Sequence, residues 1–214
     1  MTYEMKKNII STGFAIGCLV LYFLFPVGNL KFQIFFSIIT FLCFLPLLYT
    51  KIILKENAQF LGFLPFSTFN LRSLFFLISS IILGGLFAFF VVTLEWGVQK
   101  YLDVLSATIL YNFGAFLIYQ FVFVAPMVFL VTFFSWGFVY AIKWEREIYT
   151  FLIALVSYMI LLYSFYSSLW IILPFLVPTF FVQKIRDGKN ILYMSGAVFV
   201  IALIIDTLVV KAFS

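Results

Sequence analysis

Two carboxylates lie within or beside long apolar stretches of the sequence, where an ionisable side chain is a candidate for a functional role. Glu95 follows an apolar stretch over residues 74–94, and Asp206 lies near the end of another over residues 191–210. If these stretches cross a bilayer, each charge is costly to keep there and marks a functional site by default. Glu95 can reach headgroup water. For Asp206 three alternatives stay open: a place at the outer interface, an ion pair with a partner chain, or coordination of a cation.

Other residue types that usually carry catalysis are missing. The chain has no histidine, which removes the commonest general base, the commonest zinc ligand and the usual serine or cysteine triad. No span holds two carboxylates one turn apart, and Glu145 and Glu147 belong to a charged turn. Cys18 and Cys43 fit buried thiols that act as small hydrophobes. We therefore expect no metal, no cofactor and no catalytic residue of a common type.

A third group is polar but uncharged and lies in the long uncharged run over residues 104–142. This group can line a cavity or cross-link helices, and it comprises Asn112, Gln120, Thr132 and Ser135. Pro126 lies between them, and a proline removes one backbone hydrogen bond of a helix. We expect a break in the helix at this point.

The composition of the chain indicates the environment in which these residues lie. Of the 214 residues 65% are hydrophobic and only 10% are charged, with a mean hydropathy of +1.21. This predicts an all-α, polytopic integral membrane protein rather than a soluble domain. The formal net charge of +5 comes from basic residues in short loops. That distribution indicates contact with membrane lipids and not with nucleic acid.

The apolar runs predict about seven transmembrane helices in one domain over residues 1–214. Spans are expected at residues 8–27, 32–50, 74–94, 148–163, 168–181 and 191–210, with a Pro-broken fourth crossing inside 104–142. Residues 51–72 are too polar to span and are expected to lie in the interface. Gly84 and Gly85 would let a neighbouring helix approach closely. Pro174 and Pro178 predict an irregular sixth span.

The basic residues decide how often the long run crosses, because Lys and Arg accumulate on the cytoplasmic side. With one crossing and a cytoplasmic N-terminus, ten of the thirteen basic residues lie inside and only Lys31, Lys100 and Lys211 lie outside. With two crossings the split is six against seven. We therefore expect one crossing and a C-terminus outside the cell membrane.

The segment FVAPMVFLVTFFSWGFVYAIKW, residues 123–144, resembles the central motif of the CAAX protease and bacteriocin-processing (Abi) family of intramembrane proteases. In that family an Ala-Pro step leads into paired glutamates and then Phe-Arg-Gly. Aligned on Gly137, the glutamates fall on Val131 and Thr132 and the arginine falls on Trp136. The resemblance thus implies a family member that has lost these catalytic side chains.

Three further segments extend the resemblance over residues 55–210, after two N-terminal helices within 1–54: KENAQFLGF, the span around residues 157–164, and QKIRDGKNILYMSGAV. KENAQFLGF is similar to the segment that follows the early helices. The family's two histidines fall near Tyr163 or Ser164 and near Ala197 or Val198. The resemblance implies hydrolysis by glutamate-activated water with an oxyanion held by histidine and asparagine, and none of these groups is present at the matching positions.

Three functions follow as hypotheses. The first is a pseudoprotease that serves as a non-catalytic membrane scaffold and holds another membrane protein or a membrane-bound peptide, with Gly84, Gly85 and the Phe-rich fourth crossing as contact surface. The second is a transport component with its site at Pro126, Gln120 and Thr132. The third is an intramembrane protease with unusual residues, in which Glu95 and Asp206 would meet.

Overall fold

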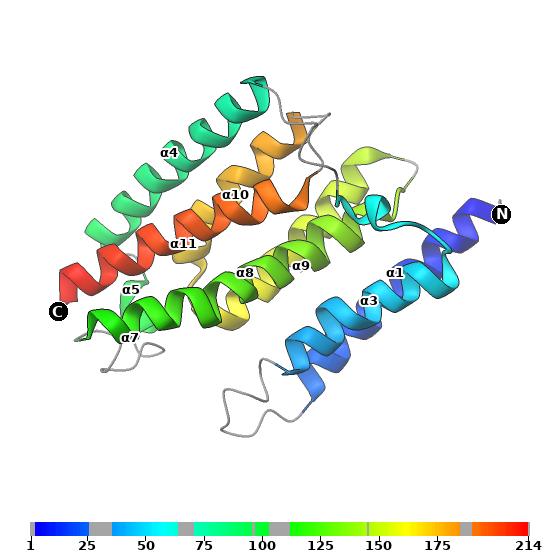
Figure 1. Cartoon of the computed structure of the whole chain (residues 1–214), viewed down its shortest axis with the longest axis horizontal. Helices are drawn as coiled ribbons and strands as arrows, with labels where there is room; N and C mark the ends of the chain where they lie inside the picture. The colour runs from blue at the N-terminus through cyan, green and yellow to red at the C-terminus, as the bar shows by residue number, and fades with distance from the viewer. Residues whose placement is uncertain are drawn as a thin grey trace. The chain divides into compact units, whose positions relative to one another are not determined.

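The computed structural model describes residues 3–25, 36–63, 71–95, 97–102, 112–144, 146–184 and 190–213 (Figure 1). Within these ranges all regular structure is helical. Six helices are long and apolar enough to cross a membrane: Met5–Leu24, Phe36–Ile53, Leu74–Thr93, Phe113–Val139, Glu147–Tyr166 and Ile191–Ala212. The predicted class, an all-α multi-pass membrane protein, is confirmed. The helical form itself follows from the bilayer, which offers no water to unpaired backbone groups.

The helices in the first half of the chain follow the apolar runs closely. Their bounds are α1 Tyr3–Leu24, η1 Ile39–Phe44, α3 Leu45–Leu48, η2 Tyr49–Ile53, η3 Ala58–Leu61, α4 Leu71–Thr93 and α5 Val98–Leu102. The second span therefore continues to Ile53, three residues into the segment expected in the interface. Residues 64–70 of that segment lie outside the described ranges.

The second half contains α7 Phe113–Ile118, η5 Tyr119–Val124, α8 Ala125–Thr132, η6 Phe133–Val139, α9 Glu147–Tyr166, α10 Leu169–Lys184 and α11 Ile191–Phe213. The first four run on without interruption as a helix of 27 residues. At 1.5 Å per residue this helix is about 40 Å long, so it fits a hydrocarbon core of about 30 Å when tilted. Residues 112–139 thus make one crossing, as the loop charges predicted, while residues 104–111 lie outside the described ranges.

The expected break at Pro126 is a change of helix type instead of an end. The amide of Ala125, directly before the proline, donates to the carbonyl of Gln120 five residues back. Leu45, directly before Pro46, donates in the same way to the carbonyl of Thr40. Both bonds have the π-helical spacing, and a π turn adjusts the helix where a proline cannot donate.

The prediction of an irregular helix at Pro174 and Pro178 is wrong, because α10 is α-helical through both. Pro178 has no amide hydrogen to donate to the carbonyl of Pro174. That carbonyl instead faces Gly84 of α4, where an added Cβ would lie 3.3 Å from it. The apolar part of α10 is only Leu169–Phe180, shorter than the other spans. In contrast, α9 is a full-length span of 20 residues, although a short one was expected.

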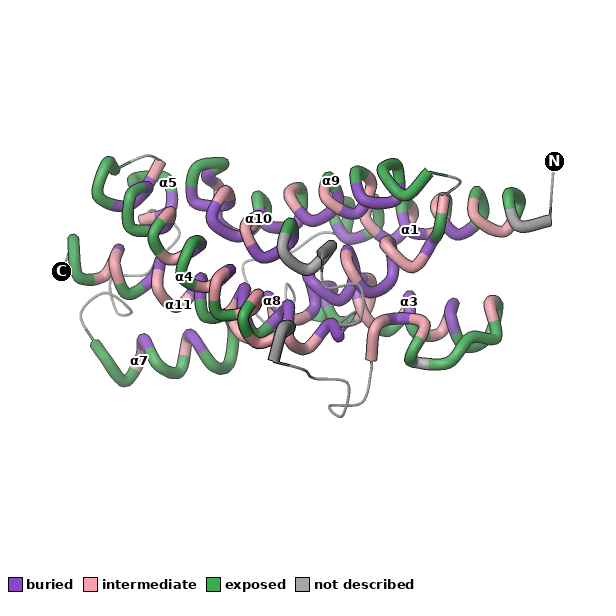
Figure 2. The backbone as a smooth tube through the Cα atoms, turned by 90° about the horizontal axis from the view of Figure 1, so that it is seen from above, coloured by how far each residue is buried: buried purple, intermediate pink, exposed green. Residues whose placement is uncertain are grey.

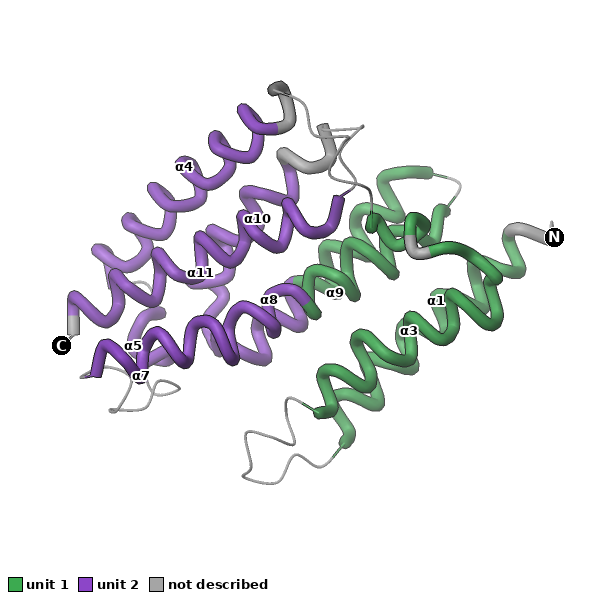
Figure 3. The backbone as a smooth tube through the Cα atoms, in the orientation of Figure 1, with its two compact units in different colours: residues 1–63, 130–158 green, residues 64–129, 159–214 purple. Residues whose placement is uncertain are grey.

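Packing divides the chain into two compact units, residues 1–63 with 130–158 and residues 64–129 with 159–214 (Figure 3). In unit 1, α1 packs on η1, and η6 packs on η1 and η3. The ring of Tyr49 stacks on Phe14 at 4.2 Å between centroids, and its hydroxyl lies 3.1 Å from the Ser11 hydroxyl. Lys7 and Glu56 form an ion pair at 3.5 Å.

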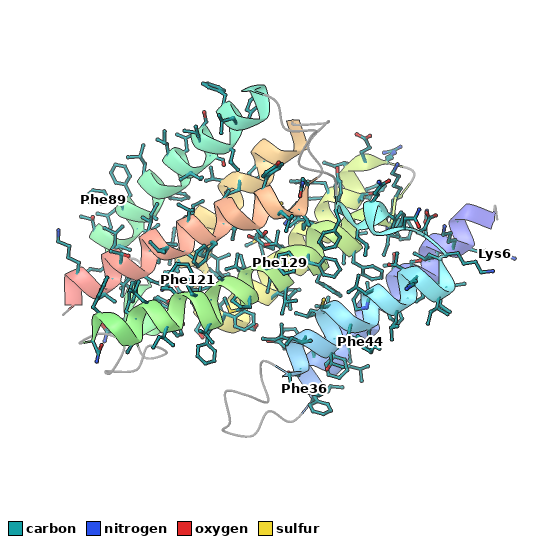
Figure 4. All side chains as sticks on the ribbon, in the orientation of Figure 1. Lys6, Phe36, Phe44, Phe89, Phe121 and Phe129 are labelled. Atoms are coloured by element: carbon teal, nitrogen blue, oxygen red, sulfur yellow. The ribbon has the colours of Figure 1, made fainter. Side chains whose placement is uncertain are left out.

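In unit 2, α4, α10 and α11 pack against one another, and η5 packs on α11 (Figure 1). The opposite sides of α4 and of α7 are exposed and apolar, as expected for lipid-facing surface (Figure 2). Among the labelled side chains, Phe89 of α4 and Phe121 of η5 are 50% and 60% exposed (Figure 4). The small-residue side of α4 faces inward: a Cβ at Gly84 would lie 2.4 Å from Ile201 Cδ1, and one at Gly85 would lie 3.2 Å from Ile204 Cδ1.

This packing makes a prediction about Gly84. Gly84→Val should lower the free energy of unfolding by about 1–3 kcal/mol, because the added methyl groups force α4 away from α10 and α11. Gly196→Val is the matched control, since Gly196 lies in α11 of the same unit and an added Cβ would meet nothing within 4 Å. Thermal unfolding of both purified variants in detergent measures the difference. Equal stability of the two variants would refute the close approach at Gly84.

Candidate functional site

Asp206 is the only charged side chain that is buried among the described residues, with 1% of its surface exposed. It lies in α11, within the span Ile191–Ala212. Asp206 is therefore enclosed by the protein itself and is not a solvated helix end. The side chain points into unit 2, toward neighbouring elements of the same chain.

Two neutral donors contact the Asp206 carboxyl group. The Tyr101 hydroxyl of α5 donates to Oδ1 at 2.5 Å, and Nε2 of Gln120 in η5 donates to Oδ2 at 2.5 Å. Tyr101 is 1% exposed and Gln120 is 0% exposed. Three elements far apart in the sequence thus meet at one carboxyl group, and we call Asp206, Tyr101 and Gln120 the Asp206 cluster.

The backbone at Gln120 explains how its side chain comes to this place. Gln120 is the second residue of the π segment η5, and its carbonyl accepts the amide of Ala125 before Pro126. Short π segments inside α-helices are frequent at functional sites, because they change the direction of side chains on the helix. Oε1 of Gln120 is buried and has no hydrogen-bond partner among the described residues. The amide therefore retains one free acceptor beside the carboxyl group.

Aromatic rings pack next to the cluster, beginning with Tyr101 of α5. The ring of Tyr101 lies 5.2 Å from that of Tyr166, which lies 5.0 Å from that of Phe175. Burial, and after it the negative charge of Asp206, raises the pKa of the Tyr101 phenol well above its usual range. Tyr101 consequently keeps its proton at neutral pH and acts as a hydrogen-bond donor.

The structure separates Glu95 from this cluster. Glu95 is exposed and lies in the turn between α4 and α5, with its backbone in the left-handed region at φ 54°. Asp206 is buried and bonded to Tyr101 and Gln120. The two carboxylates therefore occupy different environments, and the expectation that they meet is not supported by any contact.

Asn112 has a structural role that the sequence analysis did not assign. Its Oδ1 accepts the amide of Ala115 at 3.1 Å, which makes it the N-cap of α7. The side chain is exposed. Asn112 therefore begins the fourth crossing instead of lining a cavity.

The positions of the resemblance motif are distributed over both units. Val131 and Thr132 are fully buried in unit 1, together with Ser135. A Cβ at Gly137 would lie 2.9 Å from the carbonyl oxygen of Leu61, so this helix and η3 approach as closely as a glycine allows.

Trp136 packs its ring against three aromatic side chains of unit 1, Tyr140, Phe151 and Tyr158, at 5.7, 5.5 and 6.0 Å. Tyr163 and Ala197 belong to unit 2. There Tyr163 is exposed, whereas Ala197 is buried.

Tyr101 is the member of the cluster that the sequence analysis missed. It lies in the polar link over residues 95–103, between the third span and the long uncharged run, and residues 98–102 of this link form the short helix α5. Val98 and Tyr101 are spaced by three residues and are both buried. This apolar spacing within a polar link was the available signal for a helix that packs on the core.

The comparisons with known proteins add no relative. No protein-family model matches the chain, and neither a curated protein nor a solved structure matches it.

The cluster makes a prediction about stability. Tyr101→Phe should lower the free energy of unfolding by about 1–3 kcal/mol, because it removes a buried hydrogen bond and leaves Oδ1 of Asp206 unpaired. Tyr163→Phe deletes the same atom from an exposed tyrosine and should leave the stability within about 0.5 kcal/mol of the unmodified protein. Thermal unfolding in detergent compares the two, and equal effects would argue against the bond.

Proposed function

We propose that the protein is a non-catalytic membrane scaffold, a pseudoprotease of the CAAX protease and Abi type, that holds another membrane protein or a membrane-bound peptide. One observation carries the proposal. At the positions where the resemblance places two catalytic glutamates, Val131 and Thr132 are 0% exposed in a packed interior. Neither side chain can accept a proton from water at neutral pH, so this interior is filled where a protease would hold its reactive water.

The remaining acid-base groups support the same conclusion. The 214 residues include no histidine. The buried carboxyl group, Asp206, belongs to unit 2 and already accepts hydrogen bonds from Tyr101 and Gln120. Hydrolysis by an activated water would want a base at the motif itself, where Val131 and Thr132 of unit 1 supply none.

A cavity in unit 1 is too small for a peptide. It measures about 30 Å³ and is lined mainly by apolar side chains of α1 and of residues 139–157, with Thr12 and Ser157 as its hydroxyl groups. That volume admits about one water molecule. This cavity therefore does not hold a peptide.

The exposed face of α7 and η5 is the contact surface we favour. Its large apolar side chains include Phe113, Ile118, Phe121 and Val122, which are between 53% and 75% exposed. The small-residue side of α4 is already occupied by α10 and α11. Of the two surfaces expected from the sequence, the Phe-rich fourth crossing is thus the one that remains open to a partner.

The proposed orientation places the N-terminus in the cytoplasm and the C-terminus outside. It rests on the basic loops and on seven crossings, which are the six long helices together with α10. The 16 residues of α10 span about 24 Å, less than a typical hydrocarbon core, so its crossing requires local thinning of the bilayer.

Photo-crosslinking in native membranes tests the scaffold. A photoreactive amino acid at position 121 should capture one protein or peptide in stoichiometric amount. The same amino acid at position 89, which is exposed on α4, should capture only lipid. Co-purification under gentle conditions should yield the same partner. A monomer without protein or peptide, and with lipid adducts at both positions, would contradict the proposal.

A second function, a transport component, is favoured by one observation. The only buried charged residue of the described spans is bonded to Gln120 at a π segment before Pro126, and adjustable helices with buried polar side chains form the sites of many transporters. Coupling to protons requires an ionisable group within the spans, and the buried Asp206 is such a group.

Proton flux distinguishes this second function. In proteoliposomes with an internal pH dye and an applied membrane potential, Gln120→Leu should slow acidification at least about tenfold, because it removes a bond worth about 1.5–3 kcal/mol to a charged group. Gln99→Leu removes an exposed amide from α5 and is the matched control. Rates that equal those of empty liposomes for the unmodified protein would exclude proton transport.

A further inference from the structure

We propose that Asp206 is a reversible proton-binding site, at which the carboxyl group gains and loses a proton without unfolding of the protein. The proposal goes beyond a scaffold function and does not depend on it. It rests on the geometry of the Asp206 cluster and on the charged groups around it.

The first step concerns charge. An ionised carboxylate within a span is stable only when a cation or strong hydrogen bonds compensate the lost water. Asp206 makes no ion pair with any residue that the structure describes, and its two contacts are the neutral groups of Tyr101 and Gln120. Two neutral donors compensate a full charge only in part. The protonated and ionised forms are therefore close enough in free energy to exchange.

The second step concerns other titratable groups near Asp206. On the elements packed against α11, the apolar parts of α4 and α10, Leu74–Thr93 and Leu169–Phe180, contain no ionisable residue. On η5 and α9, Tyr119 and Tyr166 are phenols. Lys100 and Lys211 are exposed at the ends of their helices. Asp206 is thus the one carboxyl group among the described residues of this neighbourhood, and no described charged side chain contacts it.

The third step concerns Gln120, whose amide suits both forms. With Asp206 ionised, Nε2 donates to Oδ2 at 2.5 Å. With Asp206 protonated, rotation of the amide brings Oε1, which has no other partner among the described residues, to accept the new O–H. Rotation of this one amide therefore satisfies both the ionised and the protonated form of Asp206. A carboxylate with a purely structural role would need only the Nε2 donor and not the Oε1 acceptor.

The fourth step concerns access. Asp206 lies seven residues before Phe213, about 10 Å from the end of α11. Tyr101 lies on α5, outside the six long spans, and its neighbours Gln99 and Lys100 are exposed. In Figure 1, α5 lies beside the C-terminal end of α11. The proposal therefore brings the proton from this end of α11, where the buried Tyr101 hydroxyl lies between α5 and Oδ1 of Asp206.

The proton is favoured over a metal ion by the oxygens present. The described residues contain no group of three or more His, Cys, Asp or Glu that could hold a metal. The cluster offers one carboxyl group, an amide oxygen and phenols, fewer oxygens than the six to eight that hard cations require.

Infrared spectroscopy tests the proposal on the full-length protein. The variant Asp103→Asn/Asp187→Asn keeps Asp206 as its only aspartate, and growth on ¹³C-labelled aspartate shifts the band of that residue away from those of glutamates. We expect a protonated C=O band at low pH that disappears reversibly as the pH is raised. Adding Asp206→Asn should abolish the band, with circular dichroism as a check on folding.

Two variants test the neighbours. Gln120→Leu removes a donor to the ionised form, so the band should persist to higher pH, with at least about a tenfold gain in proton affinity. Gln99→Leu should leave the midpoint unchanged. A band that is absent at every pH, a band that persists until the protein unfolds, or a band removed by sodium ions at constant pH would each overturn the proposal.

Discussion

The structure depends on the fact that hydrocarbon offers no hydrogen bonds to the backbone. Every helix of the described chain meets this constraint by internal pairing, and the prolines are the points where pairing must be modified. At Pro46 and Pro126 the residue before the proline donates five residues back instead of four. At Pro178 the orphaned carbonyl of Pro174 faces Gly84 of a neighbouring helix. One constraint thus accounts for the π turns before Pro46 and Pro126 and is consistent with the placement of Gly84 beside the Pro174 carbonyl.

The same constraint acts on the buried carboxyl group. Asp206 could be kept in a span only with partners, and these come from α5 and η5. The three residues of the cluster connect the last span, the fourth crossing and the link after the third. Since α5 is only five residues long, its position depends on contacts such as the bond from Tyr101. Because the buried Asp206 carboxyl group needs the Tyr101 donor, it also constrains where the short helix α5 packs.

The seven predicted spans correspond to six long apolar helices and the shorter apolar helix Leu169–Phe180, because apolar length can be read directly from the sequence. The helix over residues 113–139 is continuous, as a single fourth crossing requires. The sequence also identified Asp206 and Gln120 as residues of interest, yet it did not show that they touch, since pairing between residues 86 positions apart depends on tertiary packing. The uninterrupted helix at Pro174 was not predicted, because the support from Gly84 comes from another helix. Asn112 was expected to line a cavity or to cross-link helices, whereas its side chain accepts the Ala115 amide and caps a helix.

The two π segments that precede prolines, η1 and η5, share one backbone arrangement but differ in what the side chain at the same position does. Thr40 and Gln120 are each the second residue of a six-residue π segment, and the carbonyl of each accepts the amide before a proline. The hydroxyl of Thr40 bonds to the carbonyl of Phe36 in its own helix, at 2.9 Å. Gln120 is long enough to leave its helix and reach Oδ2 of Asp206. The backbone adjustment is therefore common to both crossings, and the difference in side-chain length makes only the fourth crossing part of a buried polar site.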